Sequence, residues 1–127
     1  MNILKYVDVF SKVAKIKKVS EKEYEIITEA KINSKTPIKI FLCEENEEIY
    51  LKDNKNTLKY MNKIYELNSA DVRECIASVI KIYKFTIQSG GLVASLNSTT
   101  NALEVFYNFI ICCGQLANMY AFFDKPE

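Results

Sequence analysis

Residues 99–123, near the end of the chain, constrain the fold most, because a helix over them has only one narrow polar stripe. The polar residues fall within one arc of a 3.6-residue helix and are Glu104, Asn108, Gln115 and Asn118. Nearly every other position in the stretch is apolar. Such a helix has to be covered on most of its sides, so we expect it to form the centre of the core, a subunit interface, or both.

The composition is that of a single soluble domain that lacks several common catalytic residue combinations. The 127 residues suit one domain spanning 1–127, with 49% hydrophobic residues and a formal net charge of +1. The chain contains no histidine, which removes the serine–histidine and cysteine–histidine nucleophile systems and most zinc catalysis. We therefore predict no enzymatic activity and no cofactor. The single arginine, Arg73, also counts against sequence-specific DNA recognition.

We expect the cysteines to be reduced thiols of a cytoplasmic protein; they are Cys43, Cys75, Cys112 and Cys113. Residues 1–10 do not have the pattern of a signal peptide, since Lys5 and Asp8 interrupt the apolar positions. The chain has no CxxC pair and no histidine to complete a mixed site, so no metal site is predicted. No membrane attachment is predicted either, because residues 105–123 approach the length of a membrane span but contain several amide side chains.

The first half of the chain predicts one helix followed by three strands. Apolar residues recur at helical spacing over 3–16, opposite a lysine-rich side. Alternation of apolar and polar residues predicts strands over 23–32, 38–44 and 48–52, connected as an antiparallel meander. Some apolar side chains fall on the otherwise polar face of this meander, and we expect the first helix or a partner to cover them: Ile27, Phe41, Cys43 and Tyr50.

The second half of the chain predicts two helices, a small hairpin and the final helix. Asn54 or Asn56 is expected to cap a short helix, and Ser69 the amphipathic helix that follows. The pair Gly90-Gly91 predicts a two-residue hairpin loop, and residues 97–99 are expected to cap the last helix. The predicted fold is therefore α+β, with an antiparallel meander and a small β-hairpin packed against several helices and a long apolar C-terminal helix.

Charge is distributed unevenly along the chain. Residues 1–20 carry a net charge of +4 and residues 21–48 a net charge of −4. One interpretation is charge complementarity within the fold; the other is an acidic sheet edge that recognises a basic protein. The candidate binding residues of that edge form one turn: Glu44, Glu45, Glu47 and Glu48. A divalent cation on these carboxylates has no supporting loop pattern, so a solvated turn is the simpler interpretation.

Asp53 stands at the end of the third predicted strand, where a carboxylate has two possible roles. It can cap the following helix or accept backbone N–H groups in the turn. The alternative is a functional role, either in binding or in a carboxylate-dependent reaction centred on this residue. A deep polar pocket around Asp53 would favour that alternative.

The final helix also predicts a homodimer. Ile111 lies between Asn108 and Gln115 on the helical wheel, and Phe122 lies near the end of the same stripe. If the amide side chains face outward, these two apolar groups face outward with them. Two copies of the patch pairing about a two-fold axis would then bury them.

The segment from Thr36 onward resembles the uncharacterised bacterial and phage family called domain of unknown function 1828. The likeness lies in the stretch TPIKIFLCEENEEIYLKDNKNTLKYM, with a strand that ends at Leu51-Lys52-Asp53 and is followed by a turn and a short helix. Lys52 departs from the family pattern, as does the lack of a turn glycine near Asp53. The resemblance implies a small prokaryotic or phage protein and supplies no catalytic residues.

The sequence favours a non-catalytic protein-interaction domain of phage or mobile-element type, with inhibition of a host defence enzyme as a specific form. The alternative is a nucleic-acid-associated accessory protein. That alternative would use the lysines of the predicted helices, which are Lys12, Lys15, Lys17, Lys18, Lys55, Lys59 and Lys63.

Overall fold

A computed structural model describes residues 3–31, 36–62, 69–96 and 101–119. These residues form an α+β fold, as predicted. The helices are α1 (Ile3–Ser11), α2 (Asn56–Met61), α3 (Ala70–Tyr83) and α4 (Ala102–Ala117). The strands are β1 (Lys15–Ser20), β2 (Glu23–Ile27), β3 (Ile40–Glu45), β4 (Glu48–Lys52), β5 (Thr86–Gln88) and β6 (Gly91–Ser95).

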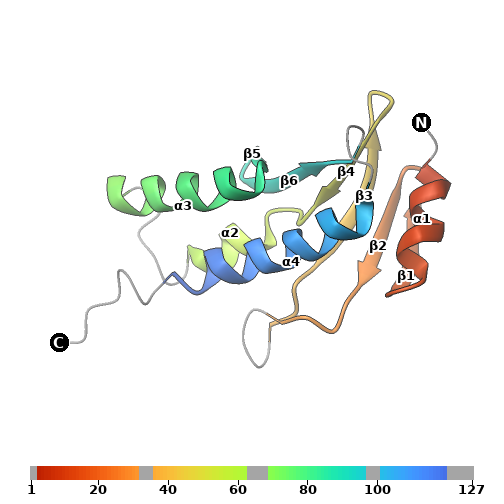
Figure 1. Cartoon of the computed structure of the whole chain (residues 1–127), viewed down its shortest axis with the longest axis horizontal. Helices are drawn as coiled ribbons and strands as arrows, with labels where there is room; N and C mark the ends of the chain where they lie inside the picture. Colours follow the sequence, from red (N-terminus) through yellow and green to blue (C-terminus); the bar gives the residue numbers. More distant parts are fainter. Residues whose placement is uncertain (1–2, 32–35, 63–68, 97–100, 120–127) are drawn as a thin grey trace.

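All described strands belong to one antiparallel sheet with the order β1-β2-β3-β4-β6-β5. The first four strands are the meander, and the β5–β6 hairpin joins it because β6 pairs with β4. The sheet therefore ends in β1 on one side and in the three-residue β5 on the other. Figure 1 shows α1 beside β1 and β2, α3 toward the opposite end, and α4 running alongside α3 and reaching the sheet next to α1.

The prediction of a helix over 3–16 was wrong beyond Ser11. Helix α1 ends there, and the chain turns into β1, which pairs with β2 through a register that sets Lys17 opposite Glu25. An edge strand needs hydrogen bonds on only one side and has no face that must be fully apolar, so its sequence shows little alternation. Lys15, Lys17 and Lys18 therefore belong to a strand and not to the end of a helix.

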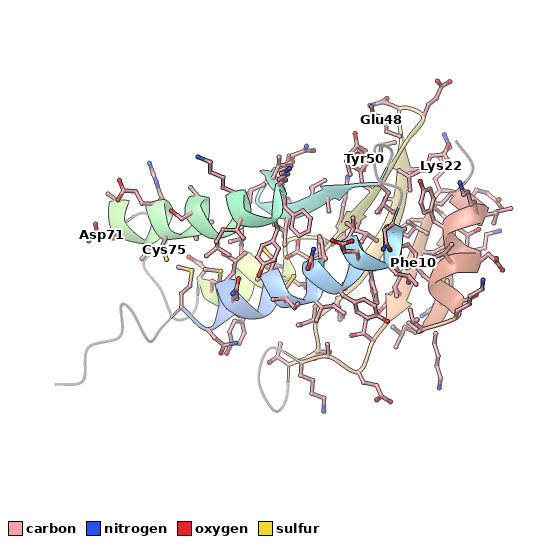
Figure 2. The ribbon with its side chains drawn as sticks, viewed as in Figure 1. Phe10, Lys22, Glu48, Tyr50, Asp71 and Cys75 are labelled. Atoms are coloured by element: carbon pink, nitrogen blue, oxygen red, sulfur yellow. The ribbon has the colours of Figure 1, made fainter. Side chains whose placement is uncertain are left out.

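One face of the sheet, here called the inner face, forms the core with the helices. Its buried side chains include Ile40, Leu42, Ile49 and Leu51, which belong to one cluster with residues of α1 and α4. Phe10 of α1 packs against Phe106 of α4, with ring centroids 5.4 Å apart (Figure 2). Burial of these large side chains supplies most of the driving force for the fold, at roughly 1.5–3 kcal/mol for each.

The expectation that α1 covers the apolar groups on the opposite, outer face was wrong, because α1 packs on the inner face. Cys43 and Val93 on the outer face are buried nonetheless, and neither belongs to the core cluster. Their neighbours on adjacent strands cover them: Tyr50 lies opposite Cys43, and Lys52 lies opposite both Phe41 and Val93. Cross-strand side-chain contacts of this kind stabilise a sheet and help to shield the apolar groups on its face.

Both β-hairpins after β2 turn on two residues with positive φ. Asn46 and Glu47 connect β3 to β4, while Ser89 and Gly90 connect β5 to β6. Positive φ at both central positions is the type I′ geometry that suits the twist of a hairpin. The predicted loop of Gly90-Gly91 is thus shifted by one residue, and Gly91 instead begins β6. A Cβ on Gly91 would lie 3.2 Å from the backbone nitrogen of Lys55, so close approach explains that glycine.

Several predicted helix caps were also misplaced. Asn101 caps α4 and its side chain accepts the N–H of Glu104 at 3.0 Å; residues 97–99, predicted for this role, lie outside the described residues. Lys55 occupies the N-cap position of α2 in a left-handed conformation, in place of Asn54 or Asn56. Ser69 is the N-cap residue of α3 as predicted, but its side chain makes no capping hydrogen bond.

Candidate functional site

Asp53 is fully buried and has a structural role. Its Oδ1 atom accepts the backbone N–H of Lys55 and that of Leu92, each at 3.0 Å, and its Oδ2 atom accepts the N–H of Thr57 at 3.1 Å. The predicted acceptance of backbone N–H groups is confirmed. The contact with Leu92, which is 39 residues further along, ties the loop after β4 to β6. The carboxylate therefore holds together the loop after β4, the start of α2 and β6.

The arrangement around Asp53 offers little to a substrate. A small cavity of about 210 Å³ lies nearby and is lined by residues of β3, β4, the loop 54–55 and the β5–β6 hairpin. Asp53 itself is not among the lining residues. Both of its carboxylate oxygens already accept hydrogen bonds from the backbone, so neither is poised as a general base.

The acidic turn does not form a single cluster. Glu45 and Glu48 lie opposite each other on the outer face, while Glu44 lies opposite Ile49 on the inner side. Glu45 is ion-paired with Lys52, and Glu48 accepts a hydrogen bond from the hydroxyl of Tyr50 (Figure 2). Among the described residues, no group of histidine, cysteine, aspartate or glutamate side chains could hold a metal ion.

The predicted lysine set divides between separate parts of the fold. Lys12 lies in the turn after α1, and three others, Lys15, Lys17 and Lys18, belong to β1. Lys55 and Lys59 lie at α2, and Lys63 lies outside the described residues. The structure thus brings together the first four lysines at the edge of the sheet and separates them from the others.

A cleft opens at the start of β1, at the end of the sheet next to α4. It has a volume of about 580 Å³ and is lined by the turn after α1, by residues 27–30 after β2, and by Phe106, Tyr107 and Ile110 of α4. Three large apolar side chains at this cleft are exposed: Val13 at 42%, Ile27 at 43% and Tyr107 at 48%. We call this feature, with Val13, Ile27 and Tyr107, the β1 cleft.

The sequence indicates only one of the three exposed residues of the β1 cleft. Ile27 is the one apolar residue on the polar face of the alternating strand 23–32, which singles it out. Val13 falls within the helix predicted over 3–16, and Tyr107 falls within the predicted final helix. Since the three residues come from separate elements, only the fold brings them together.

Ile111 lies on the exposed surface of α4, with 50% of its side chain accessible. This agrees with the expectation that the polar stripe of this helix faces outward with Ile111 in it; Glu104, Gln115 and Asn118 are also exposed. Phe122, the other predicted interface residue, lies outside the described residues.

No family model, curated protein or solved structure matches this chain. The resemblance to domain of unknown function 1828 therefore stays a prediction from the residues. Within the described residues, none of the helices combines the length and apolar character that a membrane crossing requires.

Proposed function

We propose that the chain is a non-catalytic protein-interaction domain and that it binds its partner at the β1 side of the molecule. The observation that carries this proposal is the β1 cleft next to an edge strand whose outer side pairs with no described element. Exposed apolar groups that gather at one concave place are typical of interaction sites, whereas isolated ones are ordinary. Val13, Ile27 and Tyr107 meet that description, since all three contribute to one cleft.

The acidic turn and Asp53 support a binding role less well. The carboxylates of Glu45 and Glu48 already have partners within the chain. Asp53 is enclosed by backbone groups. The β1 side combines apolar groups with a charged rim, which is the usual composition of a protein–protein interface.

Affinity capture with variants of this surface tests the proposal. The immobilised native chain, the double variant Val13→Asp/Tyr107→Asp and the control Ile82→Asp are each exposed to an extract of the source cell. Ile82 is a suitable control because its side chain is 73% exposed on α3, away from the β1 cleft. Circular dichroism establishes that all three chains are folded.

A protein that the native chain and Ile82→Asp retain, and the double variant loses, would support the proposal. Truncation of an anchoring aromatic residue typically weakens binding by about 2 kcal/mol or more. Equal retention by all three chains would place the interface elsewhere. Retention that nuclease treatment abolishes would favour the nucleic-acid alternative.

The finer proposal is that the partner is a host defence enzyme that the chain inhibits. It is supported only by the resemblance to a bacterial and phage family. Its test is the activity of the captured partner at increasing concentrations of the native chain and of the double variant. Inhibition by the native chain alone is the expected result; unchanged activity at saturation would reduce the role to binding without inhibition.

A further inference from the structure

The strand β1 ends the sheet, and no described element pairs with its outer edge. Five of its six residues are exposed, and Ile16 is half-buried. A strand in this position presents a row of backbone N–H and C=O groups that a second strand can pair with. Proteins use such edges to bind extended peptides, which gain affinity from main-chain hydrogen bonds and specificity from side-chain pockets.

The positive charge of this edge favours some binding partners over others. Residues 12–22 contain five lysines and one acidic residue, Glu21, which forms an exposed ion pair with Lys18. Pairing β1 with β1 of a second copy would bring lysines against lysines, so the charge disfavours that dimer. An extended segment that carries acidic residues is instead complementary to the edge.

The directions of the lysines favour a peptide over a nucleic acid. Lys15 and Lys17 lie on the outer face, because they are in register with Ile27 and Glu25, whereas Lys18 is in register with Tyr24 of the inner face. Successive side chains of an added strand point to opposite faces, so consecutive acidic residues can meet lysines on both faces of the edge. The phosphates of one nucleic-acid strand would need the cations gathered along a single groove.

The β1 cleft adds a pocket at one end of the edge. It includes Lys15, the first residue of β1, and the exposed side chains of Val13 and Ile27. An apolar residue at one end of a bound strand would enter this pocket while the remainder of the strand pairs with β1.

We propose that β1 binds an extended, acidic segment of the partner protein as an added strand, with an apolar residue of that segment in the β1 cleft. This inference rests on the proposed function and specifies the chemistry of the partner.

A short synthetic peptide tests this inference, with a run of consecutive glutamates and a leucine at one end. Binding to the native chain is measured by fluorescence anisotropy at low salt. Two further probes are the same peptide with all backbone amides N-methylated, and a version with lysine in place of glutamate. The charge-reversal variant Lys15→Glu/Lys17→Glu is compared with Lys59→Glu/Lys81→Glu, which makes the same charge change at exposed positions of α2 and α3.

We expect the acidic peptide to bind the native chain and the control variant alike, and the Lys15→Glu/Lys17→Glu variant about tenfold more weakly. The N-methylated and lysine versions should not bind. Equal binding of the N-methylated peptide would overturn strand addition. A single-stranded oligonucleotide that displaces the peptide at equal charge would overturn the choice of a peptide.

The two proposals fail separately. If the acidic peptide does not bind, but a cellular partner is still lost with Val13→Asp/Tyr107→Asp, then the acidic-strand inference is wrong and the interaction domain stands. If neither result is obtained, both are wrong.

Discussion

A single buried carboxylate, Asp53, holds the loop after β4 in place. Three backbone N–H groups point at it, from Lys55, Thr57 and Leu92. The first two lie within four residues and are what a turn aspartate is expected to bind. The third comes from β6, and no local pattern predicts it. The sequence therefore predicted correctly that Asp53 accepts nearby backbone N–H groups. It did not predict the long-range hydrogen bond from Leu92.

Replacing Asp53 by alanine is expected to destabilise the protein by about 3 kcal/mol, because several buried N–H groups would lose their acceptor. This is more than the roughly 1 kcal/mol typical of losing one helix cap. Urea unfolding of the variant measures the change, and Asp53→Asn should retain part of the stability. Unchanged stability combined with lost partner binding would make Asp53 a binding residue.

The cysteines differ in how far they are shielded. Cys43, Cys112 and Cys113 are buried, and Cys75 is half-buried; all four are free thiols. Burial raises the pKa of Cys43 and of Cys112 from 9.0 to about 12. It also raises the pKa of Cys113. Buried thiols of this kind are inert, so we expect a thiol reagent at pH 8 to modify Cys75 first in the folded protein.

The same shifts predict a loss of stability in alkali. In the unfolded chain these thiols ionise above about pH 9, while the fold keeps them protonated. Their contribution is complete below pH 9 and is lost as the pH rises toward 12. Urea unfolding from pH 7 to pH 11 should show this decline, with a smaller slope in Cys43→Ala. Rapid modification of Cys112 in the native protein at pH 8 would contradict the burial on which both expectations depend.

Among the elements, those with one buried face were predicted best. Strand β4 has the predicted bounds, since Ile49 and Leu51 alternate with exposed or half-exposed neighbours. Strand β1 was missed because an edge strand with exposed residues leaves no such alternation. Helix α1 was correspondingly predicted too long. The β1 side, which our proposals depend on, was therefore the part of the sheet least visible in the sequence.

Helix α3 ends in a residue that is poorly suited to its backbone. Lys84 has φ 60° and ψ 32°, and its N–H reaches the carbonyl groups of Ile80 and Lys81. Left-handed conformation costs a residue with a side chain roughly 1–2 kcal/mol, whereas glycine adopts it freely. Lys84→Gly is therefore expected to raise the free energy of unfolding by about 0.5–1 kcal/mol.

Thermal unfolding with Lys81→Gly as the matched control checks this expectation. Lys81 lies inside α3, where glycine should cost about 1 kcal/mol. Equal destabilisation by both substitutions would show that Lys84 is not in the left-handed region.

On the scale of the whole molecule, the α+β architecture followed from the sequence, while the surfaces did not. Alternation and helical periodicity specify which face of each element is buried. They do not specify which exposed residues from distant elements become neighbours, and the β1 cleft consists of such residues. The prediction of an acidic binding turn failed to anticipate that Lys52 and Tyr50 occupy two of its carboxylates.

The predicted homodimer is a property of the whole molecule. Ile111 is 50% exposed on α4, so two copies pairing about a two-fold axis would bury it; Phe122, the other predicted interface residue, lies outside the described residues. Light scattering at micromolar concentration should give a dimer for the native chain and for the control Ile82→Glu, and a monomer for Ile111→Glu. A monomeric native chain would contradict the dimer, and so would a folded Ile111→Glu chain that stays dimeric.

Amide hydrogen exchange tests most directly the claim that β1 is the binding edge. Exchange is measured on the native chain, alone and with the acidic peptide at saturation. Because an added strand would donate and accept hydrogen bonds along the open edge, we expect exchange to slow over residues 15–20 and to remain unchanged over α3. Slowing that is confined to the β3–β4 turn or to α3, with β1 unaffected, would contradict the account.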